Sequence, residues 1–338
     1  MRASTARLMN SPVRLAELAF PQAGRLIHRT RLAFIHLDNV LTFAKRDRDG
    51  RIDGYLIAYL PDECLLVFVR GGDPVNAASL QPSGRQVITI TEALKHMRAE
   101  TERGEFAYCA APLEQLAWMY QSCAVPLQSR FVDPEQPGAL FPVLQHEAVT
   151  GVVELISNGR VSYVRFDGGR FGGGYFCDKP EDMPVARFVE TLFERGADGR
   201  APVIAAQMFP PAPDLPAQAP DALIHTYREL YWRIVDGIDE EFPGEAKRRA
   251  SKVCTGILDA HKALALLSVA RGAAIPDAVV RPDELASALT DWSRQLLEGV
   301  EVMMPGAAPR ILREATQEHR FLLQSAGFYT HLPWQVAW

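Results

Sequence analysis

The sequence lacks any uninterrupted apolar run of about 18 residues, the minimum for a helix that crosses a membrane. Residues 1–20 also lack the apolar centre of a secretion signal. Apolar residues still make up 48% of the 338-residue chain, and charged residues 23%, so a mainly disordered chain is excluded. We expect a folded, cytoplasmic protein of two or three domains with no membrane span.

Paired cysteines are absent as well. The five cysteines are odd in number, far apart and never spaced as Cys-x-x-Cys, which excludes a disulfide framework and a zinc knuckle. Each lies in an apolar neighbourhood, as small core residues do. The pattern favours a reducing compartment, and we expect no metal and no cofactor. The cysteines are Cys64, Cys109, Cys123, Cys177 and Cys254.

Standard catalytic motifs are missing. The sequence contains no Gly-x-Ser-x-Gly, no His-Glu-x-x-His and no phosphate-binding loop that ends in Gly-Lys-Ser/Thr. His225 and Glu229 are one helical turn apart, but a surface pair explains them better than a metal site, since a metal site in a bundle needs Glu-x-x-His on two helices and that spacing is absent. No residue is therefore nominated as catalytic, and we expect a protein that is not an enzyme.

Charge is distributed unevenly. Residues 1–50 contain nine Lys and Arg against four Asp and Glu, a balance of +5, so a chain of net charge −5 carries −10 in the remainder. Such a basic start suits an acidic partner, an anionic lipid or a nucleic acid. Its arginines are spaced rather than clustered and have no ladder of aromatic residues among them. A solvated helical face is the preferred interpretation, and nucleic-acid binding is not expected.

Two segments of the sequence resemble each other. Gly54 to Gly71 and Gly151 to Gly168 have the same spacing, and both segments read as glycine, strand, turn, strand and a Gly-Gly pair. Strand-forming residues and the Asn158-Gly159 turn predict two β-hairpins. Each hairpin continues into a third strand, at Val75–Ala78 and Gly172–Phe176. The alternative is a chance similarity between two hairpins.

The hairpins are flanked by helical patterns, which predicts an α+β fold with two related small units at 1–130 and 138–197. We expect the first unit to carry an N-terminal helix near Val13–Arg29 and a strand at Leu32–Phe43. The further predicted elements are a strand at Glu105–Cys109 and helices at Ile90–Arg103, Pro112–Gln121 and Pro184–Glu194.

Proline marks a boundary after the second unit. Five of residues 210–220 are proline, so 198–220 is predicted to be an extended linker, in which Val203–Phe209 can still pack as a short strand. From Asp221 the apolar residues follow a period of 3.6 in four successive segments. We therefore expect 221–338 to form an all-α four-helix bundle with an aromatic tail.

A glycine-rich segment is the first candidate binding site. A strand-and-turn interpretation is preferred, but a run of glycines also lets a ligand or a partner strand approach the backbone closely. Arg70 and Arg165 lie near the ends of the two equivalent strands and can bind a carboxylate or a phosphate. These residues support the alternative function, a sensor of a nucleotide or second messenger. The glycine-rich candidates are Gly168, Gly169, Arg170, Gly172 and Gly173.

The aromatic C-terminus is the second candidate. Phe328, Tyr329, Trp334 and Trp338 lie within the last eleven residues. Because bulky aromatic side chains are costly to leave in water, we expect the tail to be ordered. It either packs back onto the chain's own domains or anchors another protein.

The second hairpin resembles a known family. Thr150–Leu155 and Val161–Arg170 are similar to the core of a bacterial family of uncharacterised regulatory domains that includes the PatA N-terminal type. The likeness covers about 40 residues in each half, and the chain departs from the pattern where Gly172–Gly174 replace a small residue. It implies a small α+β domain used in regulation and protein interaction, without catalytic residues.

These observations together predict a non-enzymatic bacterial regulatory or scaffold protein. It would act in signalling by binding another protein, or by forming a homodimer. If the hairpins paired edge to edge, a proline at Val164 would disrupt the dimer.

Overall fold

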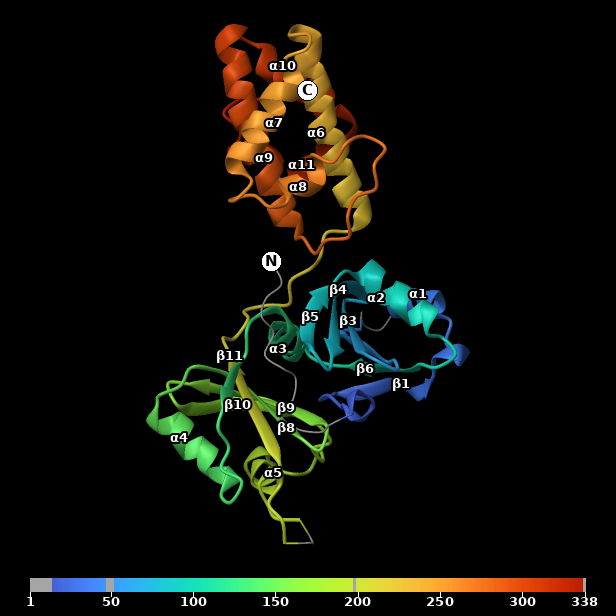
Figure 1. Cartoon of the computed structure of the whole chain (residues 1–338), viewed down its shortest axis with the longest axis vertical. Helices are drawn as coiled ribbons and strands as arrows, with labels where there is room; N and C mark the ends of the chain where they lie inside the picture. The colour runs from blue at the N-terminus through green and yellow to red at the C-terminus, as the bar shows by residue number, and fades with distance from the viewer. Residues whose placement is uncertain (1–13, 47–51, 197–198, 337–338) are drawn as a thin grey trace. The chain divides into compact units, whose positions relative to one another are not determined.

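The computed structural model describes residues 14–46, 52–196 and 199–336. The chain divides into two compact units, with the boundary between Pro216 and Ala217 (Figure 1). The first unit contains two antiparallel sheets, of six and five strands, and the second unit is helical. The predicted α+β class is therefore confirmed.

The six-stranded sheet has one face covered by two helices. The helices α1 (Leu37–Arg46) and α2 (Ile90–Ala99) pack over β3 (Cys64–Arg70) and β4 (Asp73–Gln81). The core between the helices and the sheet contains Leu56, Val67 and Phe106. Along the sheet the strands are β1 (Gly24–Arg31), β6 (Glu105–Ala110), β2 (Gly54–Tyr59), β3 (Cys64–Arg70), β4 (Asp73–Gln81) and β5 (Gly84–Ile88).

The five-stranded sheet is built in the same way. Its apolar face packs against α4 (Leu140–His146), which follows a short 3-10 turn, and against α5 (Val185–Leu192). Along the sheet the strands are β10 (Arg170–Phe176), β9 (Arg160–Asp167), β8 (Gly151–Ser157), β11 (Ile204–Phe209) and β7 (Gln128–Arg130).

A single helix, α3 (Leu113–Ala124), lies between the two sheets (Figure 1). It contacts β4 and β5 of the first sheet, while its Trp118 ring lies 5.0 Å from the ring of Tyr175 on β10. Seven of its twelve residues are buried, as expected of a helix enclosed on most sides.

The two sheets repeat one topology in the same register. Gly54 stands opposite Val69 in the first hairpin, and Gly151 stands opposite Phe166 in the second, so both pairs are offset by the same 97 residues. In the second sheet α5 leads from β10 to β11, which lies beside β8. In the first sheet the additional strand β5 follows β4, and α2 then leads to β6, which lies beside β2. A side chain on Gly54 or Gly151 would meet a carbonyl oxygen of the neighbouring strand, β6 or β11 respectively. The predicted pair of related units is confirmed.

The predicted N-terminal elements are wrong. The described residues of the expected helix Val13–Arg29 form a short 3-10 turn, Leu15–Glu17, and most of β1; Val13 lies outside the described residues. Pairing with β6 through backbone hydrogen bonds overrides the local pattern. The expected strand Leu32–Phe43 is a 3-10 turn followed by α1, because Leu37, Val40 and Leu41 recur at helical spacing toward the core.

The boundaries within the first unit differ from those expected. β7 pairs with β11, so residues 128–130 belong to the second sheet rather than to the first unit. β11 occupies part of the expected linker 198–220, where the sequence pattern allows a short strand at Val203–Phe209. Beyond it, the carbonyl oxygens of Leu215 and Pro216 accept hydrogen bonds from Arg70 (3.1 Å) and Asn76 (3.3 Å). The proline-rich segment is therefore fastened to β3 and β4.

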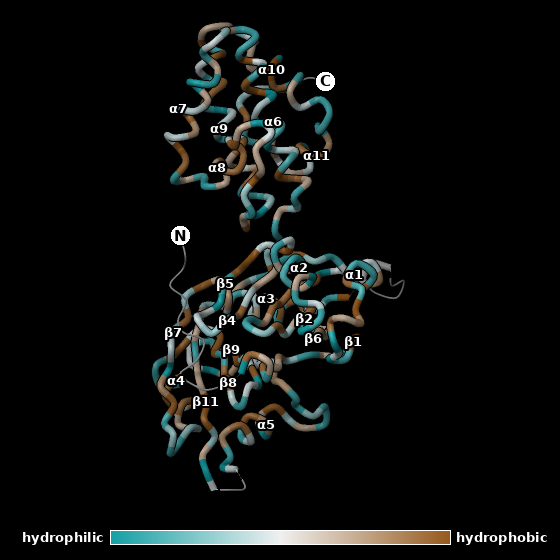
Figure 2. The backbone as a smooth tube through the Cα atoms, turned by 45° about the vertical axis from the view of Figure 1, so that its right-hand side comes forward, coloured by the Kyte–Doolittle hydropathy of each residue, from teal (hydrophilic) through white to brown (hydrophobic). Residues whose placement is uncertain are grey.

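The helical unit contains the four expected segments, the second and fourth of them interrupted. Trp292 forms its centre: the indole stacks on Tyr231 with ring centroids 4.1 Å apart and donates a hydrogen bond to the Ala250 carbonyl. Hydrophilic and apolar positions alternate along its helices (Figure 2). The helices are α6 (Asp221–Glu241), α7 (Ala246–Ile257), α8 (Leu264–Leu267), α9 (Pro282–Met303), α10 (Ala307–Thr316) and α11 (Arg320–Ser325).

No helix in the described ranges is both long enough and apolar enough to span a membrane.

Candidate functional site

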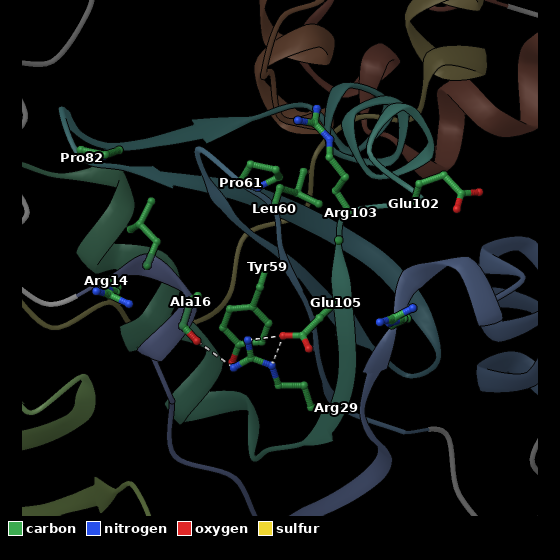
Figure 3. A pocket seen from close by; sticks show the side chains of 13 residues that line it. Arg14, Ala16, Arg29, Tyr59, Leu60, Pro61, Pro82, Glu102, Arg103 and Glu105 are labelled. Atoms are coloured by element: carbon green, nitrogen blue, oxygen red, sulfur yellow. Dashed lines mark hydrogen bonds and ion pairs between the residues drawn. The ribbon is translucent and has the colours of Figure 1, made fainter.

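An open cleft of about 860 Å³ lies beside β1, β2 and the start of β6 (Figure 3). Tyr59, Leu60 and Pro61 form part of its lining. Its charged lining consists of four arginines and two glutamates, and we call it the arginine cleft. These six residues are Arg14, Arg29, Arg31, Glu102, Arg103 and Glu105.

Arg29 is the most firmly held of the four arginines. Its Nε donates to Glu105 Oε2 at 2.7 Å, its Nη2 donates to the same oxygen, and its Nη1 donates to the Ala16 carbonyl at 2.7 Å (Figure 3). The guanidinium carbon also lies 3.9 Å from the centroid of the Tyr59 ring. Arg29 therefore joins β1, β2, β6 and the turn after Arg14.

The antiparallel pairing of β1 and β6 creates this arrangement. Arg31 stands opposite Glu105 in the register, and the irregular register of β1 brings Arg29 to the same carboxylate. Just before β6, Gly104 allows the backbone to lie close to Leu60 and Glu100. A Cβ at this position would lie 2.9 Å from Leu60 Cδ2 and 3.1 Å from the Glu100 carbonyl oxygen. The cleft thus depends on contacts between segments far apart in sequence.

The remaining arginines differ in their partners. Within the described residues, Arg14 and Arg31 are exposed and form no ion pair or side-chain hydrogen bond. Arg103 pairs with Glu100 at 2.5 Å and is two-thirds exposed. Four arginines against Glu102 and Glu105 give the lining a charge of +2, in a chain whose net charge is −5. The arginine cleft is therefore locally positive.

The chemistry of the lining suits binding. Guanidinium groups present several N–H donors in a planar fork that matches carboxylates and phosphates, and they stay protonated in proteins. Burial raises the pKa of the Tyr59 hydroxyl well above its usual range, and this hydroxyl donates to the Leu18 carbonyl at 2.8 Å. The arginines are therefore chemically suited to bind an anion, and the Tyr59 hydroxyl keeps its proton at neutral pH.

The residues expected to form a ligand site do not share one location. Arg70 binds the Leu215 carbonyl, whereas Arg165 lies 3.4 Å from Glu114 at the start of α3. Gly168 and Gly169 have left-handed φ values of 56° and 78° and form the turn between β9 and β10. The other three candidates lie along β10, where Gly173 follows a register shift. They are Arg170, Gly172 and Gly173.

The strand that contains Val164 is not an edge strand of the five-stranded sheet, contrary to the sequence-based expectation. Val164 lies on β9, which pairs with β8 on one side and β10 on the other, and it is fully buried. A proline at Val164 would break the interior of the sheet, so the expected test of edge pairing is wrong. The edge strands of this sheet are β10 and β7, and the irregular register of β10 at Phe171 and Gly173 is a feature that hinders pairing between sheets.

The aromatic tail packs onto the helical unit. Phe328 is fully buried at the start of a 3-10 turn, Phe328–His331, and its carbonyl accepts from Thr290 Oγ1 at 3.3 Å. Tyr329 and Trp334 are partly buried against the same core. Trp338 lies outside the described residues.

Sequence reasoning missed the arginine cleft. It assigned Arg14, Arg29 and Arg31 to a solvated helical face and did not single out Arg103 or Glu105. The available signal was the excess of arginine in residues 1–50. These arginines are brought together with Glu105 only by the pairing of β1 with β6, which is a contact between segments far apart in the sequence.

In the parts of the chain that the structure describes, no group of three or more His, Cys, Asp and Glu side chains is placed to hold a metal ion. No protein-family model matches the chain, and no curated protein or solved structure matches it. The resemblance to the PatA-type domains stays a prediction.

Proposed function

We propose that this chain is a non-enzymatic regulatory or scaffold protein, and that its arginine cleft receives an acidic segment of a partner protein. The observation that carries the proposal is the local charge of +2 in a chain of −5. A positive cleft on a negative molecule attracts an anionic segment and repels acidic molecules elsewhere on its surface.

The geometry of the lining supports a peptide-like ligand. The cleft is open, so an extended chain can cross it, and Tyr59, Leu60 and Pro61 offer apolar contact between the charged groups. Arg14 and Arg31 hold guanidinium groups in solvent, where they can bind carboxylates. Recognition of acidic motifs by grouped arginines is a recurrent mode of peptide binding.

Charge reversal in the full chain tests the proposal. The double variant Arg14→Glu/Arg31→Glu should weaken binding of a fluorescein-labelled tetraglutamate peptide by about tenfold or more at low ionic strength. Arg170→Glu/Arg248→Glu is the matched control, because it changes the net charge equally at exposed sites outside the cleft. Fluorescence anisotropy measures both affinities. Equal weakening by both double variants would contradict the proposal.

A small-ligand sensor is the second candidate, favoured by the cleft volume of about 860 Å³. Small-molecule sites commonly have volumes of about 300–1,000 Å³. A nucleotide or another phosphorylated second messenger would then replace the acidic peptide. Saturable thermal stabilisation by one nucleotide of a panel, with no binding of tetraglutamate, would favour the sensor.

A further inference from the structure

Glu105 is the one acidic side chain of the arginine cleft that binds an arginine of the cleft, among the described residues. It is the first residue of β6, and its Oε2 accepts from both Nε and Nη2 of Arg29. Both side chains are partly exposed, 39% for Arg29 and 45% for Glu105. The carboxylate therefore occupies the position that a carboxylate of a bound ligand would take on this guanidinium.

Arg29 has N–H donors that are not used in its contacts with Glu105 and Ala16. A guanidinium has five N–H groups. Within the described residues, two of them bind Glu105 and one binds the Ala16 carbonyl, which leaves two without an assigned partner. The Tyr59 ring, 3.9 Å from the guanidinium carbon, limits its rotation. Arg29 is thus fixed in place and oriented, but its charge is already balanced.

Arg103 is also paired, with Glu100 outside the lining, but the remaining charges of the cleft are not balanced in this way. In the described part of the chain, Arg14 and Arg31 have no acidic partner, and Glu102 forms no ion pair. The attraction for an anion therefore comes mainly from Arg14 and Arg31. A single acidic group placed at Arg29 would meet Glu105 as a like charge.

We propose that Glu105 determines the specificity of the arginine cleft by cancelling the charge of Arg29. A ligand with one carboxylate then gains little, and only a segment with several acidic side chains, long enough to reach Arg14 and Arg31, binds well. This inference rests on the proposed function, because it concerns the same cleft.

The variant Glu105→Gln tests this role in the full chain. The amide keeps the shape and an acceptor oxygen for Arg29 but removes the charge. The probes are two labelled peptides of equal length, one with a single Glu and one with four. We expect the single-Glu peptide to bind about five- to tenfold more tightly to the variant at low ionic strength, which narrows the preference for the four-Glu peptide.

Glu181→Gln is the matched control, since Glu181 is an exposed carboxylate outside the cleft. It should change either affinity by at most about twofold. The double variant Arg29→Gln/Glu105→Gln should return the preference to that of the unmodified chain, because the pair is again neutral. Far-UV circular dichroism checks that each variant is folded.

The outcomes separate the two proposals. If Glu105→Gln and Glu181→Gln tighten binding of the single-Glu peptide equally, Glu105 has no special role, and this inference fails while the acidic-ligand function stands. If Arg14→Glu/Arg31→Glu leaves four-Glu binding unchanged, or if no variant binds either peptide, the proposed function itself fails.

Discussion

Arg85 and Glu154, 69 residues apart in the sequence, form a buried bidentate ion pair that joins the two sheets of the first unit. Arg85 on β5 donates from Nη1 and Nη2 to the two carboxylate oxygens at 2.7 and 2.6 Å, and Nη1 also reaches Ser122 of α3 at 3.0 Å. The side chains are 3% and 0% exposed. Burial lowers the pKa of the Arg85 guanidinium, but the neighbouring Glu154 carboxylate raises that pKa by more, so the net shift is upward.

Breaking this pair should strongly destabilise the protein. Arg85→Met leaves the Glu154 carboxylate buried without its counter-charge, which should cost about 3–5 kcal/mol in the free energy of unfolding. Arg85→Met/Glu154→Leu should cost less, because no charge is left uncompensated. The exposed pair Arg98–Asp38 is the control, and Arg98→Met should cost less than about 1 kcal/mol. Urea denaturation followed by circular dichroism measures all three. A double variant less stable than Arg85→Met would contradict this account.

The turn between β9 and β10 separates two effects of glycine. Gly168 has φ of 56° and open space around it, so Gly168→Ala should cost about 1 kcal/mol of stability from backbone strain alone. Gly169 has φ of 78°, and a Cβ there would lie 2.5 Å from the Gln145 carbonyl oxygen. Gly169→Ala should therefore cost at least about 3 kcal/mol. Equal urea midpoints for the two variants would contradict the close approach.

A buried hydroxyl should make stability depend on alkaline pH. Burial raises the pKa of Tyr227 to about 12, whereas an unfolded tyrosine ionises near pH 10. The folded state therefore retains a proton that the unfolded state releases. The resulting stability is complete below about pH 10 and is lost as the pH rises toward about 12.

Tyr227→Phe should weaken this alkaline loss. Within the described residues the hydroxyl has no hydrogen-bond partner, so at about pH 7 the variant should be as stable as the unmodified chain or up to about 1 kcal/mol more stable. Tyr175→Phe is the contrast, because that hydroxyl donates to Glu114 at 2.9 Å, and its loss should destabilise at neutral pH. Thermal melts between about pH 7 and pH 11 test both. An unchanged alkaline decline in Tyr227→Phe would count against the shifted pKa.

The aromatic tail should contribute unequally to stability. Phe328→Ala should destabilise the helical unit by about 3–5 kcal/mol, because the ring is fully buried in its core. Trp334 is only partly buried, and Trp334→Ala should cost less than about 2 kcal/mol. Urea denaturation of the full chain, followed by far-UV circular dichroism, gives the comparison. Loss of equal stability in both variants would show that the tail packs as one piece.

Local patterns allowed the hairpins to be predicted, because their strands are adjacent in sequence and are joined by turn-forming residues, Pro61-Asp62-Glu63 in the first hairpin and Asn158-Gly159 in the second. The helical unit was also predictable, since Tyr231, Ile234 and Ile238 recur at helical spacing. The strand β5 was missed, and with it the partner of Glu154. Arg29 and Glu105 are 76 residues apart, so neither the arginine cleft nor the ion pair between the sheets has a local signature.

The position of β11 has a consequence for synthesis. It is the last strand of the first unit to leave the ribosome, yet it lies inside its sheet, between β8 and β7. The six-stranded sheet has all its strands once β6 has emerged. In the five-stranded sheet, the edge of β8 stays unpaired until β11 has been synthesised. During that interval the nascent chain presents an unpaired strand, which is the state most prone to wrong pairing. Any product that terminates before Ile204 would keep that edge permanently, and chaperones and proteases would act on it first.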